Sequence, residues 1–194
     1  MHIDEAALAP LRERYGDPVL LPWEGEVGER EFALAGFNPH RRHDFTFFVF
    51  NGDRLALIEK PQYPPGIWRP PGGGVRAGED VVEGIRREAL EELGVEIELE
   101  RYLVASEAVF RFGGETIKWR THVVSARTQD EELAPRDTEE ISAARWGTLG
   151  ELGGPLRDRL LGTGRALWRY RVALHDAAAA ALATSPQASL GSDP

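Results

Sequence analysis

The sequence predicts an α/β sandwich with a mixed central sheet, and three features of the chain lead to this fold class. Two pairs of β-rich segments are each joined by a short turn, and a helix rich in acidic residues lies between the pairs. Two further helical segments follow the last β-rich stretch. Hairpins and central strands interspersed with helices are typical of a sheet that is covered by helices.

The composition predicts a globular domain with a core of ordinary size. The chain has 194 residues, of which 42% are hydrophobic and 28% are charged. No apolar run approaches the roughly 20 residues that cross a bilayer, and the N-terminus lacks the apolar core of a signal peptide. The absence of cysteine excludes disulfides, a thiolate zinc site and a cysteine nucleophile. We therefore expect a cytoplasmic protein.

The charge of the chain limits its partners. A net charge of −9 argues against broad binding to nucleic acid or to anionic membranes, both of which need a positive surface. It does not exclude a small anionic substrate, because divalent cations can lie between protein carboxylates and phosphates.

The first 60 residues predict a helix followed by two hairpins. Residues 3–15 form the expected helix, which Gly16 and Pro18 end. Phe45 to Phe50 is aromatic and β-branched, which predicts a strand buried on both faces, and Asn51-Gly52-Asp53 predicts a tight turn. The expected strands are 19–24, 30–37, 45–50 and 54–60.

The remainder predicts one central helix, a second hairpin and two late helices. Pro and Gly are too frequent in 61–79 for regular structure. A helix is expected from Asp80 to Leu93, with Gly94 as its C-cap. Further strands are expected at 96–112, 115–127 and 141–146, and further helices at 148–161 and 164–182.

The helix at 80–93 has two distinct faces. At 100° per residue, Glu88, Glu91 and Glu92 fall within about a quarter of the circumference. Val82, Ile85, Ala89 and Leu93 form a separate apolar stripe. Three adjacent carboxylates repel one another, and hard divalent cations offset that repulsion. For the helix taken alone, a solvated acidic face is the alternative interpretation.

The segment from Gly73 to Val95 resembles the Nudix box, G-x5-E-x7-R-E-U-x-E-E-x-G-U, in which U is an aliphatic or small apolar residue. The fixed positions are filled by Gly73, Glu79, Arg87, Glu88, Ala89, Glu91, Glu92, Gly94 and Val95. Seven of these are strict identities, a match expected by chance on the order of 10⁻⁸ per start position. The preceding Trp68 to Gly73 resembles the W-x-x-P-G-G strand that leads into the box in many members.

The resemblance implies a magnesium-dependent site, in which Mn²⁺ can replace Mg²⁺. Glu88, Glu91 and Glu92 are the expected metal ligands, with the carbonyl of Gly72 as a further one. Arg87 is expected to act with Glu79, through ion pairing that holds the loop–helix–loop and orients the catalytic acids. In several members the general base lies on a loop before a late strand, which indicates Glu139 or Glu140; a solvent-facing acid is the alternative for each.

The resemblance also implies a Nudix-type α/β/α sandwich, here with an extra N-terminal β-hairpin and a C-terminal helix. We divide the chain into an extension at 1–40, a Nudix domain at 41–162, and a C-terminal helix with a polar tail at 163–194. The strands of the extension are expected either to pair across a two-fold axis in a homodimer or to cover the domain's own sheet.

The implied reaction is the attack of water on phosphorus in the phosphoanhydride of a nucleoside diphosphate linked to another group. That group would be a sugar, a second nucleoside or further phosphate. Phe110 and Trp119 are candidates for stacking on a base, with core packing as the alternative, and Arg69 and Arg111 are candidates for phosphate contacts. A catalytically silent nucleotide sensor is the competing function. Isomerase chemistry on an isoprenoid diphosphate would require a cysteine nucleophile, which the chain lacks. The net charge gives no support to cleavage of RNA 5′ ends.

Overall fold

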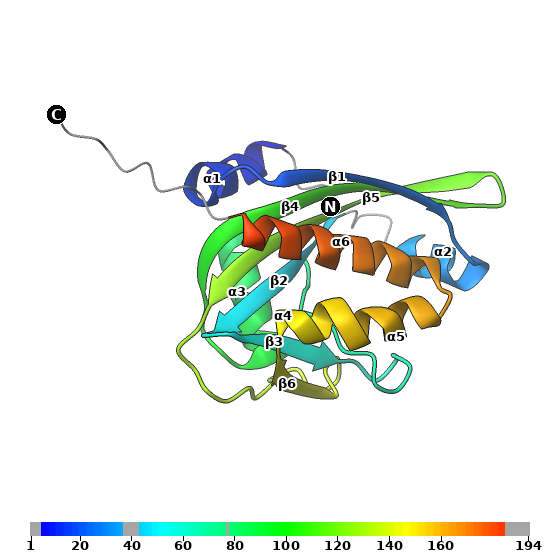
Figure 1. The fold of residues 1–194 in the computed structure, drawn as a ribbon. Helices are drawn as coiled ribbons and strands as arrows, with labels where there is room; N and C mark the ends of the chain where they lie inside the picture. Colours follow the sequence, from blue (N-terminus) through cyan, green and yellow to red (C-terminus); the bar gives the residue numbers. More distant parts are fainter. Residues whose placement is uncertain (1–4, 37–42, 77, 185–194) are drawn as a thin grey trace.

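A six-stranded mixed sheet lies between two layers of helices in the computed structural model, which describes residues 5–36, 43–76 and 78–184 (Figure 1). The strand order is β1-β4-β5-β2-β3-β6. The strands are β1 (Val19–Glu26), β2 (His43–Asn51), β3 (Arg54–Glu59), β4 (Glu98–Phe112), β5 (Glu115–Arg127) and β6 (Ala143–Gly147). No helix in the described ranges is long and apolar enough to span a membrane.

The two predicted tight hairpins are confirmed. β2 pairs antiparallel with β3 beside the Asn51-Gly52-Asp53 turn, and β4 pairs antiparallel with β5 around Gly113-Gly114. β3 also pairs antiparallel with β6. β1 with β4, and β2 with β5, run parallel. The sheet is therefore mixed, as expected for the fold class.

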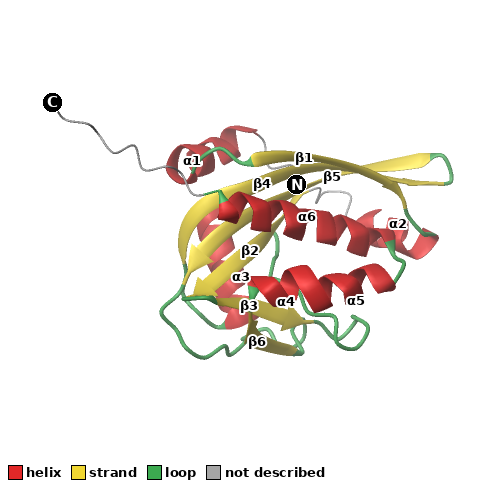
Figure 2. Cartoon of the chain, in the orientation of Figure 1, coloured by secondary structure: helices red, strands yellow, loops and turns green. Residues whose placement is uncertain are grey.

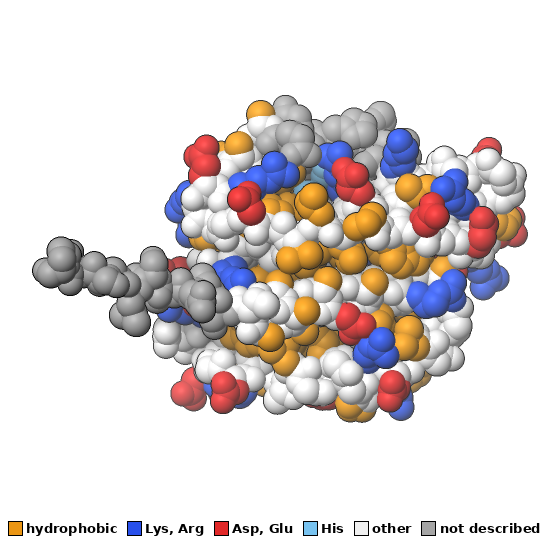
Figure 3. Space-filling model, turned by 45° about the horizontal axis from the view of Figure 1, so that its top comes forward, with side chains coloured by type: hydrophobic (Ala, Val, Ile, Leu, Met, Phe, Trp, Pro, Cys, Tyr) orange, Lys and Arg blue, Asp and Glu red, His pale blue; other side chains and the backbone are white. Residues whose placement is uncertain are grey.

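Helices cover both faces of the sheet (Figure 2). On one face, α1 (Glu5–Tyr15) and α3 (Val81–Leu93) share a core with Phe45 and Phe47 of β2. On the other face, α6 (Ala166–Ala183) packs with Phe48. β2 is thus buried on both sides, as predicted. A space-filling view shows a band of hydrophobic side chains across the middle of one face, with charged side chains around it (Figure 3).

The predicted N-terminal β-hairpin is wrong. Its second strand was expected at 30–37, but residues up to 36 form the helix α2 (Glu29–Gly36), and residue 37 lies outside the described residues. The helical period explains this, because it lets Phe32 and Ala35 pack on the second core while Glu31 turns toward the N-terminus of α6. Glu31 Oε1 accepts from the Leu167 N–H at 2.9 Å, and Glu31 Oε2 accepts from the Gly28 N–H at 3.1 Å.

The first strand of that expected hairpin covers the protein's own sheet. β1 pairs with β4 from Val19↔Val104 to Glu26↔Arg111, and it forms an edge of the sheet. Leu20 on this strand is 74% exposed. Pairing of this edge with a second copy stays a prediction.

Glycine and proline interrupt the helix expected at 148–161. The structure has α4 (Leu149–Glu151), a π-helical turn (Leu152–Leu156) and α5 (Arg157–Gly162). Gly154 adopts φ −114° and ψ −106°, which is not helical, and Pro155 follows it. The helix expected at 164–182 is confirmed as α6, and the tail from 185 onward lies outside the described residues.

The proline- and glycine-rich segment before α3 is wedged into the sheet. β2 and β3 pair with each other only at their turn end, through Phe50↔Leu55 and Asn51↔Arg54. Farther along, Arg69 exchanges two backbone hydrogen bonds with Ile58 of β3. On the β2 side, the Pro71 and Gly73 carbonyls accept from the Phe47 and Phe45 N–H groups, each at 2.9 Å. The glycine backbone of this segment is thereby held in line with the strands of the sheet, next to α3.

A buried histidine beneath α1 predicts acid sensitivity of the fold. His122 Nδ1 lies 2.6 Å from the Tyr102 hydroxyl, and its Nε2 lies 3.1 Å from His43 Nδ1. Burial, with a further contribution from His43, lowers the pKa of His122 to about 3. The unfolded chain therefore binds a proton near pH 6.5 that the folded chain does not, so stability falls as pH drops below that value.

Because of His122, we expect the free energy of unfolding to fall by about 2 kcal/mol between pH 7 and pH 5. Urea unfolding at both pH values measures the loss. His122→Gln removes the titrating group, so its decline should be smaller than that of the unmodified protein by about that amount. Equal declines in both proteins would contradict this assignment.

Candidate active site

The acidic helix α3 is fixed at both ends. Asp80 is its N-cap, and its side chain accepts from the Val82 and Glu83 N–H groups at 2.9 and 3.2 Å. Gly94 is the C-cap with φ 74°, a left-handed conformation that favours glycine. The expected apolar stripe is buried in the first core. Because that stripe faces the core, the three glutamates lie on another side of α3, next to the proline- and glycine-rich segment.

Glu92 is the most enclosed of the three, with a side chain only 3% exposed. Its Oε2 accepts from the Gly72 N–H at 2.7 Å, and its Oε1 lies 2.7 Å from Lys60 Nζ. Burial opposes the charge on Lys60, but the Glu92 carboxylate and two hydrogen bonds outweigh it and raise the pKa of Lys60. Lys60 therefore stays charged and forms an ion pair with Glu92.

Glu88 lies against the bare backbone of Gly73. An added Cβ at Gly73 would overlap the Glu88 side chain, so the carboxylate would have to move away from its present position. Burial raises the pKa of Glu88, although Arg87 opposes that shift with a hydrogen bond of 2.9 Å to Oε1. A carboxylate in this position gains from any additional positive charge.

Arg87 ties the helix to the preceding loop. Its Nε and Nη2 donate to the two Glu79 oxygens at 2.8 and 3.0 Å, and Nη2 also donates to the Gly74 carbonyl at 3.0 Å. Its Nη1 reaches Glu91 Oε2 at 2.8 Å. The hydrogen bond from Arg87 lowers the pKa of Glu79, and the same bond raises the pKa of Arg87. These contacts match the ion-pairing role that the sequence predicts for Arg87 and Glu79.

The loop after β5 brings one of the two general-base candidates to this cluster. The Ala134 and Arg136 N–H groups donate to the Leu93 and Glu91 carbonyls at 2.9 Å, and so cap the end of α3. Farther along this loop, Glu140 Oε2 lies 2.8 Å from Lys60 Nζ. Glu92 and Glu140 therefore share one ammonium. Glu139 is exposed, and its backbone N–H donates to Asp137 Oδ1.

The donor atoms at this cluster are of the type that a hard divalent cation prefers. They are carboxylate oxygens on one helix edge, together with the Gly72 carbonyl. The Pro71 and Gly73 carbonyls are bonded to β2, whereas the Gly72 N–H is bonded to Glu92. Among the described residues, no group of three or more acids and histidines converges as a ready-made metal cluster. Lys60 and Arg87 hold these carboxylates instead, so a bound cation would have to replace part of those contacts.

The four predicted substrate contacts fall in different places. Phe110 and Trp119 line one cavity of about 320 Å³ on the α6 side of the sheet. Arg69 is buried, and donates from Nε to the Tyr63 hydroxyl at 2.6 Å and from Nη1 to the Pro70 carbonyl at 2.7 Å. Arg111 is exposed and pairs with Glu24 of β1 at 2.9 Å. The structure therefore brings Phe110 and Trp119 together but separates Arg111 from them.

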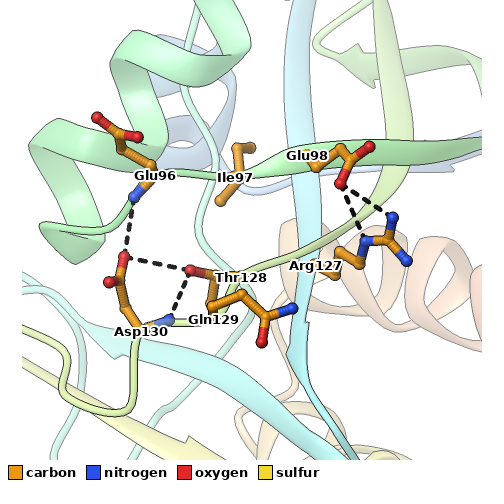
Figure 4. A pocket seen from close by; sticks show the side chains of 7 residues that line it. All are labelled: Glu96, Ile97, Glu98, Arg127, Thr128, Gln129 and Asp130. Carbon is orange, nitrogen blue, oxygen red and sulfur yellow. Dashed lines mark hydrogen bonds and ion pairs between the residues drawn. The ribbon is translucent and has the colours of Figure 1, made fainter.

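A second cavity, of about 340 Å³, lies where β4 begins and β5 ends (Figure 4). Asp130 accepts there from the Glu96 N–H and the Thr128 hydroxyl, each at 3.2 Å. The neighbouring Arg127 pairs with Glu98 at 2.9 Å. Its lining includes none of the acidic residues of α3, so it is not the site that the sequence predicts.

Comparison with known proteins identifies the family. The model of the NUDIX domain matches residues 39–165. This chain belongs to the Nudix family. The segment from Gly73 to Val95 is therefore its Nudix box, and α3 is the helix of that box.

Similar curated proteins include NAD-capped RNA hydrolase NudC of Stutzerimonas stutzeri, 33% identical over 64% of this chain and 44% of that protein. RNA pyrophosphohydrolase of Gluconacetobacter diazotrophicus is 26% identical over 69% of this chain and 90% of that protein. The chain thus spans less than half the length of NudC. In the solution structure of the E. coli ORF135 protein, 19% identity and a TM-score of 0.50 over 75% of this chain and 93% of that one show a common fold.

Sequence reasoning missed two residues beside the predicted ones. Lys60 holds Glu92 of the Nudix box, and its only signal was its rarity, since it is one of two lysines in the chain. Asp44 accepts from Trp119 Nε1 at 3.0 Å, and nothing in the local sequence links these distant positions.

Proposed function

We propose that this chain is a metal-dependent pyrophosphohydrolase, which cleaves a phosphoanhydride in a nucleoside diphosphate linked to another group. The observation that carries the proposal is the row of box carboxylates on α3 against the bare backbone of Gly72 to Gly74. The names of the relatives support it, since NudC is an NAD-capped RNA hydrolase and human NUDT13 is an NAD(P)H pyrophosphatase. Both names describe compounds that contain a nucleotide.

The residues of the chain have separate tasks in this reaction. Glu88, Glu91, Glu92 and the Gly72 carbonyl would hold Mg²⁺, or Mn²⁺ in its place. The ion supplies charge neutralisation at the phosphates and lowers the pKa of water. Arg87 and Glu79 fix the angle between the loop and the helix. Lys60 holds Glu92 and Glu140 close together, and Glu140 would accept the proton of the attacking water.

We expect Glu140→Gln to lower kcat by about 10² to 10⁴, the range of general-base catalysis. The matched control is Glu139→Gln, because Glu139 is the exposed neighbouring acid in the same loop. It should keep kcat within about threefold of the unmodified enzyme. Steady-state kinetics on the best substrate measures both values. A large loss in Glu139→Gln, with Glu140→Gln unaffected, would reverse the assignment.

Mg²⁺ should stabilise the folded chain, because it relieves repulsion between the box carboxylates. At one hundred times its Kd, a bound ligand adds about 2.7 kcal/mol, equivalent to roughly 5 to 10 °C in Tm. Thermal unfolding with Mg²⁺ and with EDTA measures this shift without any substrate. Glu83→Gln, an exposed acid of α3 that pairs with Arg86, is the control and should retain the shift. A shift of the same size in Glu92→Gln would contradict the ligand assignment.

The competing function is a silent nucleotide sensor. Such relatives usually lose box glutamates, and this chain keeps all of them. The deciding experiment incubates the protein and Mg²⁺ with nucleoside triphosphates, nucleotide sugars, ADP-ribose, dinucleoside polyphosphates and NADH, and follows the products by chromatography. We expect one class to be hydrolysed. Demonstrable Mg²⁺ binding with no hydrolysis would favour the sensor.

A further inference from the structure

The cavity that contains Phe110 and Trp119 lies outside the box and is walled by aromatic rings. Tyr63, Trp168 and Tyr170 also line it. Its volume of about 320 Å³ is at the lower end of the range for small-molecule sites. Partly apolar walls with a few polar groups suit a planar aromatic ligand, because every base presents a face that can stack on such rings.

Segments beyond the Nudix match close this cavity. Leu34 and Ala35 come from α2, and Trp168, Tyr170 and Arg171 come from α6. These residues lie outside 39–165, the range that the family model matches. The two extensions, whose role the sequence left open, therefore build a site that the shared core alone lacks.

The cavity is linked to the box through β2 and Arg69. Asp44 lines it, and the next residue of β2, Phe45, donates its N–H to the carbonyl of Gly73, the first residue of the box. Arg69 holds the hydroxyl of Tyr63 on the cavity side, and its charge also interacts with Glu92 of the box. One substrate molecule with a base at one end and a diphosphate at the other suits this arrangement.

The polar group best placed to read a base is the Asp44 carboxylate. Its Oδ1 accepts from Trp119 Nε1 at 3.0 Å and from the Thr121 hydroxyl at 2.5 Å. Its Oδ2 lies 3.6 Å from Arg171 Nη2, which is longer than a hydrogen bond. Within the described residues, Oδ2 has no other recorded partner at hydrogen-bond distance. This oxygen can accept a hydrogen bond from an amino group, and it cannot donate one to a carbonyl.

We propose that this cavity binds the nucleobase of the substrate and that Asp44 Oδ2 selects a base with an exocyclic amino group over uracil. The proposal rests on the proposed function, because it names the substrate class of the same enzyme. Trp119 supplies the stacking face, and its bond to Asp44 holds the carboxylate in position. Uracil presents carbonyl oxygens where adenine presents an amino group, so a carboxylate repels it.

Binding of AMP, UMP and ribose 5-phosphate in EDTA tests this without hydrolysis, since none of the three contains an anhydride. Isothermal titration should give AMP an affinity about tenfold higher than UMP, the effect of one charged hydrogen bond. Ribose 5-phosphate should bind more weakly than either. Equal affinities for AMP and UMP, or ribose 5-phosphate binding as well as AMP, would overturn the proposal.

Two variants place that binding in the cavity. Asp44→Asn can both donate and accept, so the ratio of AMP to UMP affinity should fall to about one. Trp119→Ala should weaken AMP at least tenfold, whereas Trp119→Phe keeps a stacking ring and most of the affinity. Trp146→Phe is the control, because Trp146 lies on β6 and donates to the Glu131 carbonyl. Unchanged AMP affinity in Trp119→Ala, with its fold intact by circular dichroism, would overturn the proposal.

The two hypotheses fail in different ways. Hydrolysis that depends on Glu92, combined with indifference to the base and to Asp44, would remove the base site and leave the proposed function standing. Selective AMP binding by a protein that hydrolyses nothing would remove the proposed function and leave the base site standing.

Discussion

Replacing Glu92 by Gln is expected to lower kcat/KM by about 10³ or more, because metal charge stabilisation is worth several kcal/mol and each 1.4 kcal/mol is tenfold in rate. Gln keeps the size of the side chain but removes the charge that binds the cation. It also leaves the buried Lys60 paired with Glu140, whose own side chain is 63% exposed. Steady-state hydrolysis of the best substrate with Mg²⁺ measures the loss.

Glu83→Gln is the matched control for this substitution. It removes one negative charge from an exposed position of the same helix, away from the box carboxylates. Its kcat/KM should stay within about threefold of the unmodified enzyme, since isolated surface pairs contribute little. Urea unfolding of both variants separates loss of chemistry from loss of fold. Activity in Glu92→Gln close to that of Glu83→Gln would remove Glu92 from the site.

Replacing Gly94 by Ala is expected to destabilise the fold by about 3 kcal/mol, the sum of left-handed strain and of overpacking. Gly94 has φ 74°, and an added Cβ would overlap the backbone carbonyl of Ala134. Backbone at that position cannot rotate away as a side chain could. The same loop caps α3 and carries Glu140, so the substitution should also lower activity. Urea unfolding measures the change in stability.

A second left-handed glycine separates the two causes. Gly164 has φ 69°, and an added Cβ there would meet nothing within 4 Å. Gly164→Ala should therefore cost only the conformational part, about 1 kcal/mol. Equal losses in both variants would show that the contact between Gly94 and Ala134 contributes nothing.

The box and its helix could be predicted because their information is local. The spacing of Val82, Ile85, Ala89 and Leu93 sets the buried face of α3, which in turn sets the direction of the glutamates. Turn residues such as Gly113-Gly114 predicted the hairpins for the same reason. The family and the two tight hairpins followed from these short-range patterns.

Features that depend on distant partners could not be predicted in this way. The polarity of residues 30–37 alternates only weakly. The helix α2 packs through Phe32 and Ala35, and its Glu31 accepts from the N-terminus of α6, a partner far away in the sequence. The same limit applies to Lys60, which pairs with acids 32 and 80 positions away. Trp119 and Phe110 were candidates from residue type alone, and only the packing of α2 and α6 brings them into one cavity.

The most direct test of the central claim is hydrolysis of the substrate panel in water enriched in ¹⁸O, with Mg²⁺ and with mass spectrometry of the products. Attack of water on phosphorus predicts one ¹⁸O in a phosphate group of one product, and no turnover in a parallel Glu92→Gln sample. An intact panel in the presence of bound Mg²⁺, or turnover that Glu92→Gln leaves unchanged, would contradict the account.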